Sequence, residues 1–199
     1  EYYEKALQMC VEIGNKDGIA ANLGSIGIVY QNLSDYPKAL EYLKKSLQIN
    51  EEIGNKKGIA SNLGNIGNVY TSLSDYLKAL EYYEKTLQIN EEIGNKSGIA
   101  TNLGNIGNVY YFLSDYPKAL EYYEKALQIF EEIGSKNSIA AILGNIGIVY
   151  SNLSDYPKAL EYYKKSLLID EEIGNKNGIA ANLGSIGIVY RYLSDYPKA

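Results

Sequence analysis

The sequence GNIGNVY at residues 64–70 decides the fold, because close versions of it return at a constant spacing. They begin at residues 24, 64, 104, 144 and 184, so each lies 40 residues after the one before. A fixed internal period of this size is typical of stacked supersecondary units rather than of one central core. We therefore expect residues 1–199 to form a single elongated repeat array.

Each period contains two helical patterns separated by a turn. In the first copy, apolar residues recur at spacings of three and four over 18–33, which predicts one face of a helix. A turn follows at 34–37, where Asp35 is a suitable N-cap and Pro37 is tolerated in the first turn of the next helix. A broad apolar stripe then predicts a second helix over 36–53. We expect the stretch Gly14-Asn15-Lys16 to close one helix and link it to the next.

Stacking decides the fold class, since neither helix of a pair can bury its apolar face alone. The expected class is all-α: an α-solenoid, a right-handed superhelix of antiparallel helix pairs. The first helix of each pair should line the concave surface and the second should lie outside. The expected boundaries are a partial repeat at 1–17 that holds a second helix, full repeats at 18–57, 58–97, 98–137 and 138–177, and a partial repeat at 178–199 that holds a first helix and the start of a second.

Charge and composition exclude several classes of partner. The 19 Lys and Arg residues are interspersed among 24 Asp and Glu, which leaves no basic stripe and argues against binding to nucleic acid. No apolar run approaches the roughly 20 residues that cross a bilayer, so no membrane partner is expected. A single cysteine, Cys10, allows no intrachain disulfide and favours a cytoplasmic location.

Catalytic chemistry finds no support in the sequence. Histidine is absent, and the lone Cys10 therefore has no imidazole to activate it. The carboxylates occupy repeated positions on what should be solvated helix faces. The sequence predicts a protein that is not an enzyme and that holds no metal or cofactor.

The repeat resembles the tetratricopeptide repeat. That family marks its first helix with a large apolar residue, an apolar-Gly pair and a tyrosine, and its second with an Asp-aromatic turn, a small residue, an aromatic residue and another small one. These positions are held here by Leu63, Ile66, Gly67, Tyr70, Asp75, Tyr76, Ala79, Tyr83 and Thr86. The resemblance implies an α-solenoid scaffold for protein–protein interaction.

The 40-residue period, longer than the family's usual 34 or so, is similar to the subclass found in LGN- and Pins-type adaptors and in bacterial signalling proteins. This implies a segment of a larger signalling or regulatory protein. Some family members bind acidic peptides through basic residues in the first helix. This chain carries small residues at those positions, including Ala21, Ser61 and Gly64, so the resemblance does not transfer an acidic-ligand site.

Nine residues form the candidate peptide-binding site in the concave groove. Amides there could pair with a peptide backbone, and aromatic rings could supply anchors. The residues are Ile28, Asn65, Asn68, Asn105, Asn108, Tyr111, Phe112, Asn145 and Ile148. In the alternative interpretation, the asparagines solvate the surface or bond between neighbouring first helices, and the isoleucines pack against the next helix. The partner would be a protein or peptide of unknown identity.

The helices expected at the two ends of the sequence leave a second class of function open. Residues 1–13 match a second helix without its first, and 178–193 match a first helix without its second. Such complementary ends predict head-to-tail self-association, which can propagate. The alternative function is therefore a structural spacer or self-assembling element.

Overall fold

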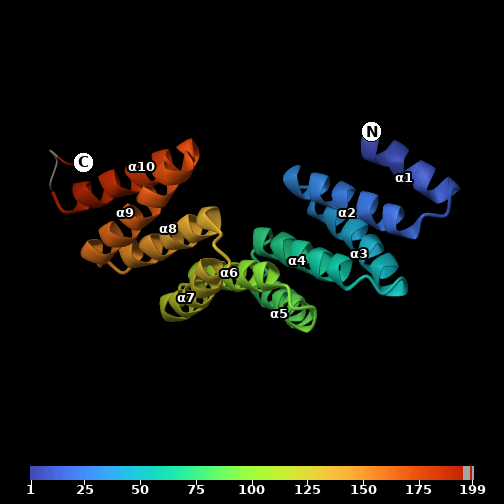
Figure 1. The fold of residues 1–199 in the computed structure, drawn as a ribbon, viewed down its shortest axis with the longest axis horizontal. Helices are drawn as coiled ribbons and strands as arrows, with labels where there is room; N and C mark the ends of the chain where they lie inside the picture. The colour runs from blue at the N-terminus through green and yellow to red at the C-terminus, as the bar shows by residue number, and fades with distance from the viewer. Residues whose placement is uncertain (195–197, 199) are drawn as a thin grey trace. The chain divides into compact units, whose positions relative to one another are not determined.

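The computed structural model describes residues 1–194 and 198, and these residues form ten α-helices and no β-strand (Figure 1). The helices are α1 (Tyr2–Glu12), α2 (Lys16–Asn32), α3 (Tyr36–Glu52), α4 (Lys56–Ser72), α5 (Tyr76–Glu92), α6 (Lys96–Phe112), α7 (Tyr116–Glu132), α8 (Lys136–Asn152), α9 (Tyr156–Ile173) and α10 (Lys176–Tyr192). The even-numbered helices are the first helices of the repeats, and the odd-numbered ones are the second helices. The all-α solenoid class is confirmed. The expected start of a further helix after residue 194 lies outside the described residues.

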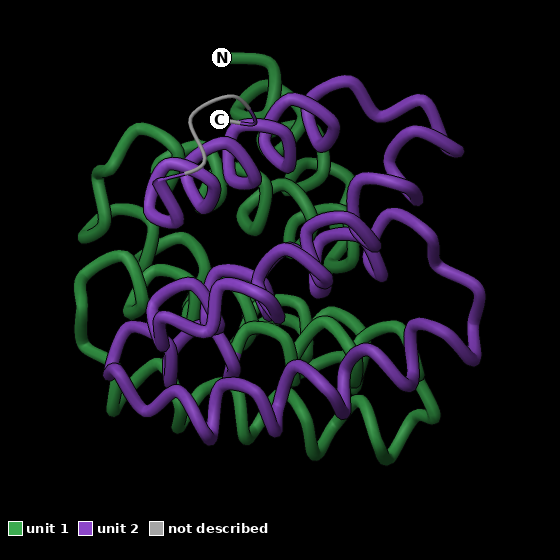
Figure 2. The backbone as a smooth tube through the Cα atoms, turned by 90° about the vertical axis from the view of Figure 1, so that its left-hand side faces the viewer, with its two compact units in different colours: residues 1–105 green, residues 106–199 purple. Residues whose placement is uncertain are grey.

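The chain divides into two compact units, Glu1–Asn105 and Ile106–Ala199, with the boundary inside α6 (Figure 2). In the first unit α2 packs on α3 and α4 on α5, and α3 also contacts α4. In the second unit α7 contacts α8, α8 packs on α9, and α9 packs on α10. Each unit thus stacks helix pairs that follow one another in the sequence.

The first helices begin two residues earlier than expected, at Lys16 rather than at residue 18. Asn15 is the reason, because its side chain accepts a hydrogen bond from the Gly18 amide at 3.0 Å and so caps the helix. The expected linker at 14–16 is therefore wrong at Lys16, which is the first residue of α2. Gly14 does take the left-handed conformation, at φ 68°. Asp35 caps the second helix as expected, accepting from the Lys38 amide at 3.3 Å.

Close contact between the two helices of a repeat depends on the second glycine of the repeated sequence. A Cβ on Gly67 would lie 2.6 Å from a ring carbon of Tyr83, and a Cβ on Gly27 would lie 2.7 Å from Leu43. Tyr83 is buried, and Leu43 lies in a core cluster with Ala39, Ile66 and Val69. Glycine therefore brings the first helix onto a large side chain of the second.

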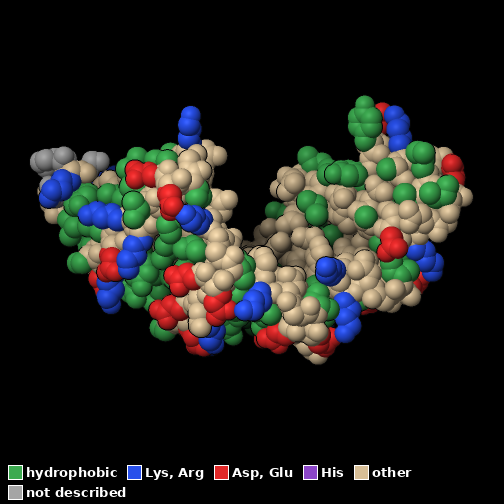
Figure 3. Space-filling view, in the orientation of Figure 1, with side chains coloured by type: hydrophobic (Ala, Val, Ile, Leu, Met, Phe, Trp, Pro, Cys, Tyr) green, Lys and Arg blue, Asp and Glu red, His purple; other side chains and the backbone are tan. Residues whose placement is uncertain are grey.

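Charged side chains occupy the exposed surface in pairs. Glu41 and Lys45 lie 2.6 Å apart within α3, and Lys16 bridges to Glu52 of the following repeat at 3.0 Å. On the face drawn in Figure 3, basic and acidic side chains are interspersed, and neither sign forms a continuous stripe. Exposed pairs of this kind contribute little to stability. Within the described residues, no helix has the length and apolar character required to span a membrane.

Candidate functional site

A small cavity in the second unit brings together five of the nine residues expected to bind a peptide. Its volume is about 190 Å³, and Tyr123 of α7 completes its lining. The Tyr111 and Phe112 rings meet edge to face with 5.6 Å between their centroids, and Phe112 is 52% exposed. We call this site the aromatic cavity; its expected residues are Asn108, Tyr111 and Phe112 of α6 and Asn145 and Ile148 of α8.

The Asn108 side chain is held in one orientation from two sides. The Tyr123 hydroxyl donates to its Oδ1 at 2.7 Å, and Asn145 Nδ2 donates to the same oxygen at 3.3 Å. Burial raises the pKa of the Tyr123 hydroxyl, which keeps it protonated as a donor. Among the described residues no acceptor meets Asn108 Nδ2. The side-chain oxygen of Asn108 thus accepts two hydrogen bonds within the fold, and its amino group remains able to donate to a ligand.

Two cavities of the first unit contain the remaining expected residues. Asn65, Asn68 and Asn105 line a cavity of about 340 Å³ between α4 and α6. Ile28 lines a cavity of about 380 Å³ between α2 and α4, which Asn65 also borders. The amide ladder expected between Asn68 and Asn108 stays a prediction, because these residues belong to different units.

A buried group of polar side chains, which the sequence analysis missed, lies between α2, α3 and α4. Ser46 Oγ donates to the Ala20 carbonyl at 2.7 Å and accepts from Asn62 Nδ2 at 3.0 Å. Asn50 Nδ2 donates to the Ser46 carbonyl at 3.0 Å, and Asn50 Oδ1 accepts from Asn55 Nδ2 at 2.9 Å. We call Ser46, Asn50, Asn55, Asn62 and their equivalents the polar clasp. It ties two first helices to the second helix between them.

Where the repeats at 98–137 and 138–177 meet, apolar residues replace three members of the polar clasp. Ala126, Phe130 and Ile142 stand at the positions of Ser46, Asn50 and Asn62, and all three are buried. Losing the polar partners together avoids leaving a single buried group without a hydrogen bond. That joint change across two successive repeats is the sequence signal that could have revealed the clasp.

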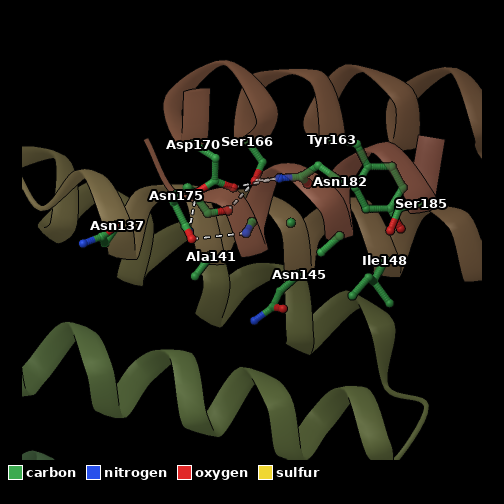
Figure 4. Close-up of a pocket in the computed structure, with 14 residues that line it drawn as sticks. Asn137, Ala141, Asn145, Ile148, Tyr163, Ser166, Asp170, Asn175, Asn182 and Ser185 are labelled. Atoms are coloured by element: carbon green, nitrogen blue, oxygen red, sulfur yellow. Dashed lines mark hydrogen bonds between the residues drawn. The ribbon is translucent and has the colours of Figure 1, made fainter. Parts of the chain in front are cut away.

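In the last clasp an aspartate replaces the asparagine. Asp170 corresponds to Asn50, is 3% exposed and lines a cavity of about 250 Å³ formed by α8, α9 and α10. Figure 4 shows Asn175 and Asn182 converging on it; their Nδ2 groups donate to its two carboxylate oxygens at 2.8 and 2.9 Å. We call this site the Asp170 cavity. No residue of this clasp was among the nine expected ones.

Most polar groups that line these cavities are amides and hydroxyls, which bind by hydrogen bonds, and Asp17, Lys57 and Asp170 add charged groups. In the part of the chain that the structure describes, no group of three or more His, Cys, Asp or Glu side chains is placed to hold a metal ion. Cys10, the free cysteine, accepts a contact from Asn22 Nδ2 at 3.7 Å. The arrangement is suited to recognising peptide groups.

Stacked helix pairs with cavities on the first helices define the class: the chain is an α-solenoid repeat protein with the architecture of a protein–protein interaction scaffold. The sequence profile of the Tetratricopeptide repeat family matches residues 1–52, 58–132 and 138–199. The chain therefore belongs to the tetratricopeptide repeat family. Its assignment to the long-period subclass remains a prediction.

Several solved structures share this fold. BtubC (BKLC) from P. vanneervenii is 19% identical with a TM-score of 0.86, over 100% of this chain and 84% of that one. A Rap protein complexed with competence and sporulation factor is 19% identical with a TM-score of 0.83, over 98% and 58%. A signal transduction ATPase with a tetratricopeptide repeat sensor, from Pyrococcus horikoshii, is 24% identical with a TM-score of 0.80, over 94% and 30%. No curated protein matches the sequence significantly.

Proposed function

We propose that the chain is a non-catalytic scaffold that binds a peptide or a helix of a partner protein along its first helices. The aromatic cavity carries this proposal, because it sets two aromatic rings beside a fixed amide donor. Aromatic anchors dominate the energy of many interfaces, and a donor held in place by Tyr123 adds direction by pairing with a ligand carbonyl. The Rap protein of the same fold is complexed with competence and sporulation factor, which supports a ligand-binding role.

The remaining expected residues extend the proposed surface in each unit. Asn65 and Asn105 donate and accept no side-chain hydrogen bond among the described residues, so their amides are available to a ligand. Ile28 and Ile148 are 39% and 37% exposed and offer shallow apolar contact. We further propose that the repeats at 18–57, 58–97, 98–137 and 138–177 belong to one array, that the array is a segment of a larger signalling or regulatory protein, and that it acts in the cytoplasm.

Selection of peptides from a random library on the immobilised 199-residue chain, followed by titration of variants, tests the binding site. Tyr111→Ala and Asn108→Ala should each weaken a selected peptide about tenfold or more, since each removes an anchor or a fixed donor. Glu121→Gln is the control, because Glu121 pairs with Lys125 on the exposed face of α7. Unchanged affinity in both cavity variants, with circular dichroism showing a retained fold, would contradict the assignment.

Self-assembly is the second candidate function, and exposed apolar surface on the terminal helices favours it. Leu183 of α10 is 53% exposed where its counterpart Leu143 is 6% exposed, and Tyr3 of α1 is 49% exposed where Tyr83 is 2% exposed. A head-to-tail contact between copies would bury both surfaces. Sedimentation equilibrium of the 199-residue chain tests this. An apparent molecular mass that rises with protein concentration, and that returns to the monomer value in Leu183→Asp, would support assembly. A monomer at every concentration would contradict it.

A further inference from the structure

The Asp170 carboxylate accepts hydrogen bonds from its neighbours, but no positively charged side chain among the described residues balances its negative charge. Both donors, Asn175 and Asn182, are neutral amides, and the described residues place no Lys or Arg in an ion pair with it. Removing a carboxylate from water is costly unless a positive charge compensates. The nearby first turn of α10, against which the carboxylate packs at Gly178, offers only about half a charge. The cavity therefore retains an uncompensated negative charge.

Resting on the function proposed above, we propose that the Asp170 cavity receives a lysine side chain of the bound peptide. Part of the cavity wall is made of small residues, including Ala141, Gly144 and Ala181. The aliphatic part of a lysine side chain can pack against them while its ammonium group approaches the carboxylate. At about 250 Å³ the cavity is smaller than the roughly 300–1,000 Å³ of small-molecule sites, and it suits one side chain.

The geometry favours an ammonium over a guanidinium. Each oxygen of Asp170 already accepts one amide hydrogen bond, so the carboxylate cannot offer both oxygens freely to the planar fork of an arginine. A lysine ammonium is a point charge with three rotatable donors and needs only one remaining lone pair. The Ser166 hydroxyl is neutral and is already engaged on both sides, since it donates to the Ala140 carbonyl at 2.8 Å and accepts from Asn182 Nδ2 at 2.9 Å.

The Asp170 cavity adjoins the aromatic cavity along α8. Asn145 and Ile148 line both. A peptide that places an apolar residue beside Tyr111 can therefore continue into the Asp170 cavity without leaving the surface. The recognised sequence would combine an apolar or aromatic anchor with a lysine.

The first unit provides internal controls. Its two corresponding cavities contain Asn50 and Asn90 in place of Asp170, so they lack this carboxylate, although Asp17 and Lys57 line them where Asn137 lines the Asp170 cavity. Asn50→Asp should create a second lysine site, because Asn55 and Asn62 stand where Asn175 and Asn182 donate to Asp170. Asp170→Asn installs the residue found at positions 50 and 90, and it should abolish lysine binding at the native site while α9 stays folded.

The test titrates the 199-residue chain with Nα-acetyl-lysine methylamide while following backbone amide signals by NMR. We expect saturable shifts at Asn175, Gly178 and Asn182, at least tenfold weaker binding in Asp170→Asn, and new shifts around Gly58 in Asn50→Asp. The uncharged norleucine analogue should give no shift, and the arginine analogue should bind more weakly than lysine. Equal affinity in wild type and Asp170→Asn, or no saturable shift up to tens of millimolar ligand, would overturn the inference.

The two proposals fail separately. Loss of peptide binding in Tyr111→Ala and Asn108→Ala without any lysine shift would leave the scaffold function standing and remove only the lysine site. Lysine binding that depends on Asp170, with peptide affinity unchanged in the aromatic-cavity variants, would instead remove the aromatic cavity as the peptide site.

Discussion

The Tyr123 hydroxyl donates a 2.7 Å hydrogen bond to Asn108 Oδ1, so a core residue of α7 sets the orientation of a surface amide on α6. The same relationship holds in the first unit, where the Tyr83 hydroxyl donates to Asn68 Oδ1 at 2.7 Å. The tyrosine packs against a glycine of the first helix and reaches the cavity with its polar end. Fold and candidate site are connected through this side chain.

Tyr123→Phe should therefore lower the free energy of unfolding by about 1 kcal/mol, since it removes one hydrogen bond and leaves the packing of the ring in place. Urea denaturation followed by circular dichroism measures the change. Tyr2→Phe, at a residue that is 84% exposed, is the control and should change nothing. Equal effects of the two substitutions would show that the Asn108 bond contributes no stability.

Ser166→Ala should destabilise the chain by about 1–3 kcal/mol, because it removes the buried hydroxyl that donates to the Ala140 carbonyl and leaves Asn182 Nδ2 with Asp170 as its remaining acceptor. Replacing the whole clasp at once, with Ser166→Ala, Asp170→Phe and Asn182→Ile, copies the apolar set present at 126, 130 and 142. The triple variant should be less destabilised than the sum of the three single variants. Additive unfolding free energies would contradict the coupling.

Substitution by alanine should have opposite effects on stability at a glycine that packs against a neighbouring helix and at a glycine that faces open space. Gly67→Ala places a Cβ 2.6 Å from the Tyr83 ring and should destabilise by about 1–3 kcal/mol through overpacking. Gly184→Ala meets no heavy atom within 4 Å and should stabilise α10 by about 1 kcal/mol, the usual difference in helix propensity. Thermal unfolding of the two variants measures both; a change of the same sign in each would refute the distinction.

Alkaline pH should weaken the fold through its buried tyrosines. Burial raises the pKa of the Tyr83, Tyr123 and Tyr163 hydroxyls above the ordinary 10.0. A folded-state pKa above the unfolded value means that their contribution to stability is complete below about pH 10 and is lost as pH rises through the higher folded-state values. Urea denaturation at a series of pH values, with tyrosinate absorbance, follows this loss.

The matching control is the variant in which all three tyrosines are phenylalanine. It has no buried hydroxyl to ionise, so its unfolding free energy should fall less steeply between about pH 9 and pH 11. The remaining slope comes from lysines and from Tyr82 and Tyr162, whose pKa values are also raised and which are the same in both proteins. An equal slope in the two proteins would show that the buried hydroxyls are not responsible.

Local regularities made most of the fold predictable. The three- and four-residue spacing over 18–33, the Asp35 cap and the left-handed Gly14 each depend on a few neighbouring residues, and the structure contains all three. The role of Gly67 could be inferred as well, because a glycine inside a helix is unfavourable unless close packing compensates. The helix start at Lys16 was missed, since Asn15 can serve equally as a linker or as a cap.

The sequence by itself determined the repeat period, the helix pairs and the set of exposed amides and rings, because these follow from spacing along one chain. Only the tertiary structure decided that Asn62 and Asn182 are buried, that Asn108 is oriented by Tyr123, and that Asp170 lines a cavity to which the described residues contribute no Lys or Arg. Each of these depends on side chains of helices from the same and the following repeat meeting in space. Helical periodicity places a residue on a face, but burial and hydrogen-bond partners are set by the helix that packs against that face.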